Sequence, residues 1–178
     1  MKKLQIVVIG GYREGFSEKT SQTAIEVGRE IAARGHILVT GMSTGIGALA
    51  AKGAKEKGGL VVGVSPASSR GEEEKFLCDS SSTDVVITTG MGFKGRNVTL
   101  VRSADAVIAI EGKFGTLNEA TIALSEKKPL VSIVDSGGTS DLLSGIIEKL
   151  EPGCKLFTTA QNAKEALEKA ESMAKGML

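Results

Sequence analysis

A run of five apolar residues from Ala106 to Ile110 (AVIAI) constrains the fold of this chain most strongly. A strand without any polar residue must be covered on both faces, as strands are in a parallel sheet with helices above and below it. Gly112, Gly115 and Thr116 follow the run and predict the start of a helix. A helix start presents unpaired N–H groups and the positive end of the helix dipole, and glycine lets a ligand approach the backbone. The segment is therefore a predicted site for a phosphate or a ribose.

The same alternation of strand and helix repeats along the chain. Short apolar runs predict strands, and apolar residues at helical spacing predict the helices between them. The predicted strands cover residues 4–9, 37–40, 60–64, 85–88, 106–110 and 130–134 with an edge strand at 155–159, and the predicted helices cover 20–35, 46–57, 97–103, 116–126, 141–150 and 160–175. Ser, Gly and charged residues from Ser65 to Asp84 predict a loop. This order predicts right-handed crossovers and hence an α/β fold with a Rossmann-like, doubly wound, mainly parallel sheet and helices on both faces.

Composition narrows the class of protein. The chain has 178 residues, 41% of them hydrophobic, and this length predicts a single domain spanning residues 1–178. The 22 basic and 21 acidic side chains give a net charge of +1, which indicates no general attraction to nucleic acid or to an anionic membrane. Aromatic residues make up 3% of the chain, which argues against a base-stacking platform for single-stranded DNA. A phosphate ligand would have to be held by local groups.

Cysteine and histidine content excludes further classes. Cys78 and Cys154 are too few for a disulfide framework, and with the single His36 they cannot form a zinc site of the Cys/His type. His36 begins a strand after a helix end, so we expect it to be structural, and one histidine leaves no Ser-His-Asp arrangement. No run approaches the ~20 apolar residues of a membrane helix, and the first apolar run lacks a cleavage pattern. We expect a cytoplasmic protein without a membrane partner, a resident metal or a cofactor.

Four glycine-bearing turns follow predicted strands, and the carboxyl ends of parallel strands meet at one edge of a sheet. The turns lie at 10–11, 41–47, 90–96 and 112–116. The second turn has neither the dinucleotide fingerprint nor a Walker A lysine, so a tight packing turn is as good an interpretation of it as a phosphate site. The predicted ligand-binding residues are Gly10, Gly11, Gly41, Ser43, Gly45, Gly47, Gly112, Gly115 and Thr116.

Arg96 and Glu119 are the candidate reactive side chains. Each also has an ordinary interpretation: Arg96 as a solvated surface residue, and Glu119 as the last residue of a capping box that begins at Thr116. Both residues, however, lie next to the glycine turns that are predicted to meet at one crevice. The pair is therefore expected at the same strand-end crevice as the glycines.

Four segments together form a more specific pattern than any one of them alone. They are Gly10-Gly11 after the first strand, TGMSTGIG at 40–47 after the second, Arg96 before Ser103-Ala104-Asp105, and EGKFGTLNE at 111–119. This pattern resembles that of the LOG (Lonely Guy) superfamily, the lysine decarboxylase-like group related to the DprA-type Rossmann fold. The similarity covers residues 4–134.

Three positions depart from the usual LOG pattern. Glu111 stands in place of a proline, Lys113 in place of the second glycine of the last motif, and Asn97 in place of a lysine. The Gly-Arg-Asn form at 95–97 is more similar to the branch that includes molybdenum cofactor carrier proteins.

The resemblance implies two functions. LOG enzymes split a cytokinin nucleoside 5′-monophosphate into free base and ribose 5-phosphate. The resemblance to them implies that Arg96 and Glu119 are the catalytic pair here. The carrier branch implies instead a protein that binds a nucleotide or a pterin-like molybdenum cofactor without turning it over. Both readings imply a homodimer or a larger homo-oligomer. DNA binding of the DprA type is disfavoured by the balanced charge, and no residue pattern marks a Schiff-base lysine for a decarboxylase.

Overall fold

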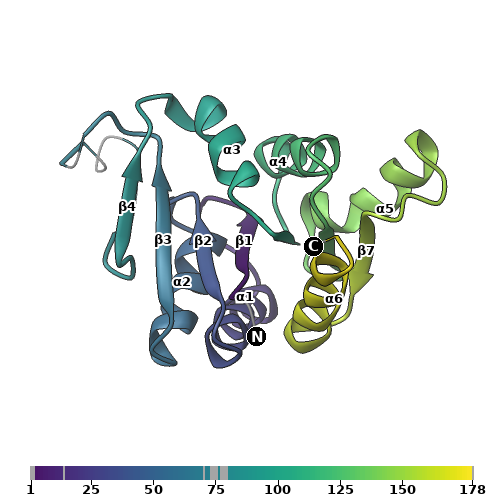
Figure 1. Ribbon diagram of the computed structural model, residues 1–178, viewed down its shortest axis with the longest axis horizontal. Coiled ribbons are helices and arrows are strands. Elements are labelled where there is room, and N and C mark those ends of the chain that lie inside the picture. Colours follow the sequence, from purple (N-terminus) through teal and green to yellow (C-terminus); the bar gives the residue numbers. More distant parts are fainter. Residues whose placement is uncertain (1–2, 14, 70, 73–75, 77–79, 178) are drawn as a thin grey trace.

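The computed structural model describes residues 3–13, 15–69, 71–72, 76 and 80–177, and these residues form one seven-stranded sheet flanked by helices (Figure 1). The strands are β1 (Gln5–Gly10), β2 (Ile37–Thr40), β3 (Leu60–Ser65), β4 (Val85–Thr88), β5 (Ala106–Ile110), β6 (Leu130–Ile133) and β7 (Phe157–Ala160). The helices are α1 (Glu18–Ala33), α2 (Ile46–Glu56), α3 (Gly92–Arg102), α4 (Phe114–Ser125), α5 (Gly138–Leu150) and α6 (Ala163–Lys175).

The sheet is built outward from β1 in two directions. Its strand order is β4-β3-β2-β1-β5-β6-β7, and neighbouring strands are parallel throughout. The chain first runs from β1 to the β4 edge and then returns to the other side of β1 for β5. The predicted Rossmann-like, doubly wound fold is confirmed, and its topological switch point lies between β1 and β5.

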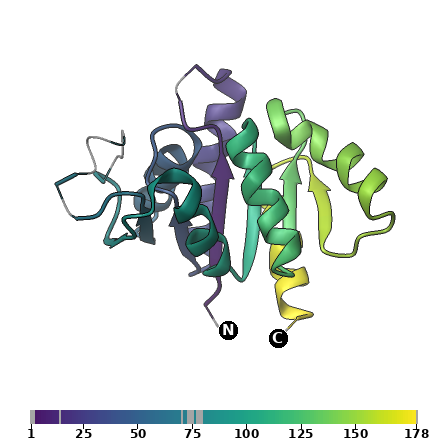
Figure 2. The same ribbon diagram turned by 90° about the horizontal axis from the view of Figure 1, so that it is seen from above.

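Two hydrophobic clusters hold the helices against the sheet. Helices α1, α2 and α6 pack on one face, against side chains that include Ile6 and Leu38. Helices α3, α4 and α5 pack on the other face, where α3 and α4 lie side by side (Figure 2). All residues of β5 are buried, so the expectation that this strand is covered on both faces is confirmed. In the described part of the chain, no helix is both long and apolar enough to cross a membrane.

Helix α1 begins at Glu18, two residues earlier than predicted, and three further helices, each with glycine in its first turn, also begin early. Helix α3 begins at Gly92 instead of residue 97, α4 at Phe114 instead of 116, and α5 at Gly138 instead of 141. Glycine lies in the first turn of α3, α4 and α5, and its poor helix propensity hides the start from a pattern of apolar spacing. The described residues between 66 and 84 form no strand or α-helix, as the predicted loop requires, and Cys78 lies outside the described residues.

Helices α1 and α2 pack backbone against backbone because each has a glycine at the contact. A Cβ atom on Gly28 of α1 would overlap the carbonyl oxygen of Ala50, and one on Gly53 of α2 would overlap the carbonyl oxygen of Ile25. The two helix backbones are therefore in direct contact. This contact fixes how the two helices lie on the sheet, and the turn that leads into α2 borders the edge where the glycine turns meet.

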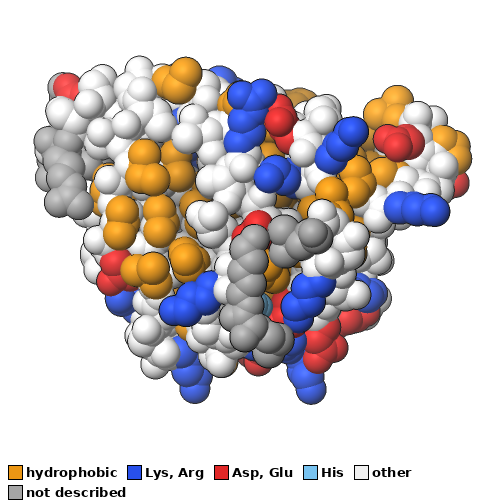
Figure 3. Space-filling model, viewed as in Figure 1, with side chains coloured by type: hydrophobic (Ala, Val, Ile, Leu, Met, Phe, Trp, Pro, Cys, Tyr) orange, Lys and Arg blue, Asp and Glu red, His pale blue; other side chains and the backbone are white. Residues whose placement is uncertain are grey.

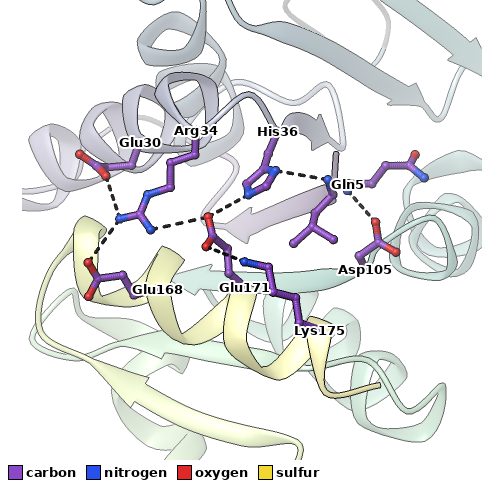
Figure 4. A network of polar contacts seen from close by, with 9 residues as sticks. Gln5, Glu30, Arg34, His36, Asp105, Glu168, Glu171 and Lys175 are labelled. Carbon is purple, nitrogen blue, oxygen red and sulfur yellow. Dashed lines mark hydrogen bonds and ion pairs between the residues drawn. The ribbon is translucent and has the colours of Figure 1, made fainter. Parts of the chain in front are cut away.

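A polar network joins the last helix to the start of the sheet (Figure 4). The backbone N–H of Leu4 donates to His36 Nδ1 over 3.3 Å, and His36 Nε2 lies 2.8 Å from Glu171 Oε1 on α6. Because Nδ1 is an acceptor, the proton of the neutral ring lies on Nε2 and is donated to the carboxylate. Arg34 approaches the same oxygen of Glu171 to 3.6 Å. His36 precedes β2, so it lies at the amino ends of the strands, away from the glycine turns.

The glycine contact between α1 and α2 predicts that glycine-to-alanine substitutions will destabilise the protein at this contact but not elsewhere in its helices. Gly28→Ala and Gly53→Ala should each lower the free energy of unfolding by about 2 kcal/mol or more, because the backbones must separate. Gly145→Ala is the matched control, because a Cβ there meets no atom within 4 Å on α5. It should raise stability by about 0.5–1 kcal/mol through helix propensity. Urea unfolding measures all three, and equal effects at Gly28 and Gly145 would contradict the close crossing.

Candidate functional site

A cleft of about 600 Å³ opens at the carboxyl ends of the strands, beside the switch point between β1 and β5. Most of the predicted site residues line this cleft. They are Gly10, Gly11, Gly41, Ser43, Gly47, Arg96, Gly115, Thr116 and Glu119. The structure therefore brings together segments that are more than a hundred residues apart in the sequence, in the crevice where ligands of doubly wound sheets bind.

Two predicted ligand-binding residues, Gly45 and Gly112, do not line the cleft. Gly45 has φ +90°, and a Cβ there would overlap the carbonyl oxygen of Gly11. Gly112 has φ +96°, and a Cβ there would overlap the hydroxyl group of Thr116. Both conformations are unfavourable for residues with a side chain, so these glycines shape the turns that carry the cleft.

Arg96 lies within α3 and not in a turn before it, and it points into the protein. Its side chain is 4% exposed, and its Nη1 donates to Glu119 Oε1 on α4 over 3.3 Å. The guanidinium lies against Gly41, where a Cβ atom would overlap it. The interpretation of Arg96 as a solvated surface residue is therefore wrong. Gly41 has no side chain because the arginine fills that space.

Glu119 is not part of a capping box. Helix α4 begins at Phe114 with Lys113 as its N-cap, so Thr116 is the third residue of the helix and cannot cap it. The Glu119 side chain is 10% exposed and turns toward Arg96. Burial raises the pKa of Glu119 to about 7, although Arg96 and Lys94 both act to lower it. Near neutral pH the carboxyl group therefore exists in both protonation states.

A second contact between α3 and α4 holds this pair in register. Asn97 Nδ2 donates to Asn118 Oδ1 over 2.8 Å, one residue along each helix from Arg96 and Glu119. Asn97 is one of the departures from the LOG pattern, and its side-chain amide is the donor of this bond. The residue thus ties together the two helices that carry the candidate reactive groups.

Glu111 marks a turn that differs from the proline turn of the LOG pattern. Its φ is +55°, a value that a proline ring does not permit. Its backbone N–H donates to Ser136 Oγ over 2.9 Å, a bond that proline also could not make. Glu111 lines the cleft, where a Cβ on Gly11 would overlap its carboxylate. The substitution of glutamate for proline therefore changes the turn as well as its charge.

Several lining residues were not found by sequence reasoning. Arg13, Lys94 and Lys113 add positive charge to the cleft, and Tyr12 and Phe93 add aromatic surface. Phe93 lies three residues before Arg96, so the two share one face of α3 once the helix is known to start at Gly92. The spacing of three residues between Phe93 and Arg96 is the sequence signal that could have identified Phe93 as a cleft residue. Among the described residues, no cluster of three or more His, Cys, Asp or Glu side chains could hold a metal ion.

A parallel sheet that reverses at β1 and β5, with a buried arginine–glutamate pair in the crevice, defines a Rossmann-like α/β protein with a ligand-type cleft at its switch point. The chain belongs to the SLOG cluster4 family, whose model matches residues 3–174. The resemblance to the LOG superfamily is thereby confirmed.

Two relatives of this chain come from different organisms and differ in how similar they are to it. An uncharacterized protein of Archaeoglobus fulgidus is 43% identical over 133 residues, which cover 75% of this chain and 82% of that protein. A cytokinin riboside 5′-monophosphate phosphoribohydrolase of Arabidopsis thaliana is 26% identical and covers 94% of this chain and 77% of its own length.

Solved structures of other proteins share the fold of this chain. The molybdenum cofactor binding protein of Rippkaea orientalis has a TM-score of 0.82 and 30% identity and covers 97% of this chain and 98% of its own. DNA processing protein A of Streptococcus pneumoniae shares the fold, with a TM-score of 0.68 and 19% identity over 93% of this chain and 61% of its own.

The raised pKa of Glu119 predicts a pH dependence of stability. Between the ordinary value of 4.5 and about 7, the folded protein retains a proton that the unfolded chain releases. The free energy of unfolding should therefore fall as pH rises through this interval, by an amount on the order of 2 kcal/mol. Glu119→Gln has no such proton and should flatten the curve, whereas Glu126→Gln, in an exposed ion pair, should not. Urea unfolding from pH 5 to pH 8 measures this, and the same slope in Glu119→Gln would contradict the assignment.

Proposed function

We propose that the cleft binds a nucleoside 5′-monophosphate and that the protein hydrolyses its N-glycosidic bond to free base and ribose 5-phosphate. The observation that carries the proposal is the buried Arg96–Glu119 pair in the cleft, with the pKa of Glu119 near 7. A titratable group poised near the working pH is what acid–base chemistry needs. The Arabidopsis relative, a phosphoribohydrolase by name, supports the same reaction.

In the proposed reaction, the bond between the base nitrogen and C1′ of the ribose breaks as a water oxygen bonds to C1′. The transition state is oxocarbenium-like, and the Glu119 carboxylate stabilises its positive charge and accepts the proton of the water. The base leaves with the bonding electron pair and takes up a proton. Arg96 holds the carboxylate in place through the 3.3 Å bond and favours its ionised form. The ionised form is the active one, so the rate should rise with pH up to about 7 and then level off.

The phosphate would bind at the start of α4. Gly115 lies in the first turn of this helix, lines the cleft and has no protein atom within 4 Å of an added Cβ. The N–H groups of the helix start and the Lys113 ammonium would face the phosphate oxygens.

Release of free base from purine and cytokinin-type nucleoside 5′-monophosphates, followed by chromatography, tests the hydrolase. Glu119→Gln and Arg96→Ala should each lower kcat by about 100-fold or more, because the first removes the carboxylate that acts on the transition state and the second removes the group that positions and ionises it. The neighbouring pair Arg102–Glu126 is a matched control, since it also joins α3 to α4 but at the surface, over 2.8 Å. Arg102→Ala and Glu126→Gln should keep full activity. Activity that survives in Glu119→Gln would rule out the proposed mechanism.

A second candidate function is a carrier that binds a nucleotide or the molybdenum cofactor without turning it over. Glu111 favours it, because this residue replaces the proline of the LOG enzyme motif and its φ of +55° gives a turn that proline cannot form. The similarity to the molybdenum cofactor binding protein of Rippkaea orientalis supports it as well. The same panel separates the two functions: a carrier raises its melting temperature with ligand but releases no base. Gly115→Ala should weaken either kind of binding while the protein stays folded.

We also propose that the protein is a cytoplasmic homo-oligomer. Leu60, Val85 and Ile87, here called the β3–β4 patch, are each more than 40% exposed. Strand register places them on the face of the sheet that α3 covers only in part. Figure 3 shows hydrophobic side chains gathered over this part of the sheet. A contiguous apolar surface of this kind is typical of an interface, and a second copy of the chain is the proposed occupant.

Light scattering of the purified protein tests the oligomer. The wild type should be a dimer or larger, and Ile87→Lys should shift it toward the monomer because a charge would be buried in the apolar contact. Leu142→Lys is the control, since Leu142 is 63% exposed on α5 and lies outside the patch. A monomeric wild type, or dissociation by both variants alike, would refute the patch as the interface.

A further inference from the structure

The few aromatic residues of this chain gather at the cleft. The sequence contains five phenylalanines and one tyrosine and no tryptophan. Tyr12, Phe16, Phe93 and Phe114 line the cleft, and Phe76 packs edge-on against Phe93 at 5.7 Å between ring centroids. The fully buried core side chains are all aliphatic or methionine. Phe157 of β7 lies away from the cleft and packs against the core, so core packing accounts for Phe157 but not for the aromatic residues whose rings are exposed at the cleft.

Tyr12 and Phe93 form one wall of the cleft, called the aromatic wall here. Their ring centroids are 6.3 Å apart with the ring planes inclined by 38°. The residues are 46% and 37% exposed, so a large part of each ring is open to the cleft or to solvent. Phe16 differs from them because it packs against the core cluster of α1 and α2. Core packing therefore explains the position of Phe16 but not the positions of Tyr12 and Phe93.

The aromatic wall adjoins the candidate reactive pair. The Arg96 guanidinium lies 5.9 Å from the centroid of Phe93 and 3.3 Å from Glu119. A second guanidinium, that of Arg13, lies 5.2 Å from the Tyr12 centroid. These cations hold the rings by cation–π attraction and make the wall suitable for an electron-rich heteroaromatic ring. Arg96 thus links a stacking surface to the carboxyl group.

We propose that the aromatic wall is the subsite for the planar ring of the ligand, a bicyclic heteroaromatic such as a purine or a pteridine. The inference rests on the proposed function in that the cleft must bind a ligand of this kind. It adds the orientation: the ring stacks on Tyr12 and Phe93, and the phosphate lies at the start of α4. The bond between ring and sugar then lies beside Arg96 and Glu119. A sugar phosphate without a ring would use only the α4 end.

Tyrosine fluorescence tests the wall directly, because Tyr12 is the only tyrosine and the chain has no tryptophan. Adenosine 5′-monophosphate should quench this emission and raise the melting temperature of the full chain. Ribose 5-phosphate should raise the melting temperature without quenching. N-acetyltyrosinamide at the same nucleotide concentrations corrects for light that the nucleotide absorbs.

Substitution of Phe93 tests whether the ligand ring stacks on an aromatic surface or only contacts an apolar side chain. Phe93→Leu keeps an apolar side chain but removes the π surface, and it should weaken binding of adenosine 5′-monophosphate about tenfold while leaving ribose 5-phosphate unchanged. Phe157→Leu is the matched control, because Phe157 lies on β7, does not line the cleft and packs against the core cluster of α3, α4 and α5. It should bind both compounds as the wild type does.

The outcomes distinguish the wall from the proposed function. If adenosine 5′-monophosphate raises the melting temperature without quenching Tyr12, and Phe93→Leu binds it normally, the site is correct and the aromatic wall is wrong. If neither compound changes the melting temperature, the proposed function fails and the ring subsite fails with it. Quenching together with loss of affinity in Phe93→Leu alone supports the wall.

Discussion

The pairing of β1 with β5 is the constraint on which the rest of the molecule depends. These strands are adjacent in the sheet although a hundred residues separate them, and five residue pairs align them in parallel. Because the chain turns in opposite directions on the two sides of this pair, the loops after β1 and β5 diverge and leave a crevice. Gly10, Gly11 and Glu111 therefore meet there. Helices α3 and α4 cover the same face beside it, which brings Arg96 within reach of Glu119.

A buried ion pair is a poor source of stability, since removing both charges from water costs about as much as their attraction returns. The role of this ion pair is to hold the Arg96 and Glu119 side chains in a fixed position in the cleft. Gly41 gives the guanidinium its space, the amide bond between Asn97 and Asn118 fixes the spacing of the two helices, and Phe93 covers the arginine. The surface pair Arg102–Glu126 spans the same two helices without any of this enclosure. The contrast shows that burial, and not the ion pair itself, raises the pKa of Glu119.

The sequence predicted the strands of this protein well, because six of the seven are short runs of mainly apolar residues; β7, with two threonines, was expected only as an edge strand. It also placed most of the glycines that line the cleft. It failed at helix starts that contain glycine, and that failure affected function: with α3 beginning at residue 97, Arg96 was assigned to a turn and Phe93 was not recognised as its neighbour. The capping box at Thr116 was a similar error, since a start two residues earlier turns a cap into an ordinary helical position. The charge environment of Glu119 depends on burial by α3 and on Lys94, which no local pattern contains.

Glu119 exchanges its proton with solvent near neutrality, and this has a consequence for anything anionic that enters the cleft. A negative charge placed beside the carboxyl group disfavours its ionised form, so binding of an anion draws a proton from the buffer. The heat of binding would then include the ionisation heat of the buffer, and affinity would strengthen in mildly acidic solution. The ionised form that the proposed hydrolysis needs and the protonated form that favours an anionic ligand lie on opposite sides of the same titration. Near neutral pH the carboxyl group is therefore divided between the form that would favour an anionic ligand and the form that the proposed hydrolysis would need.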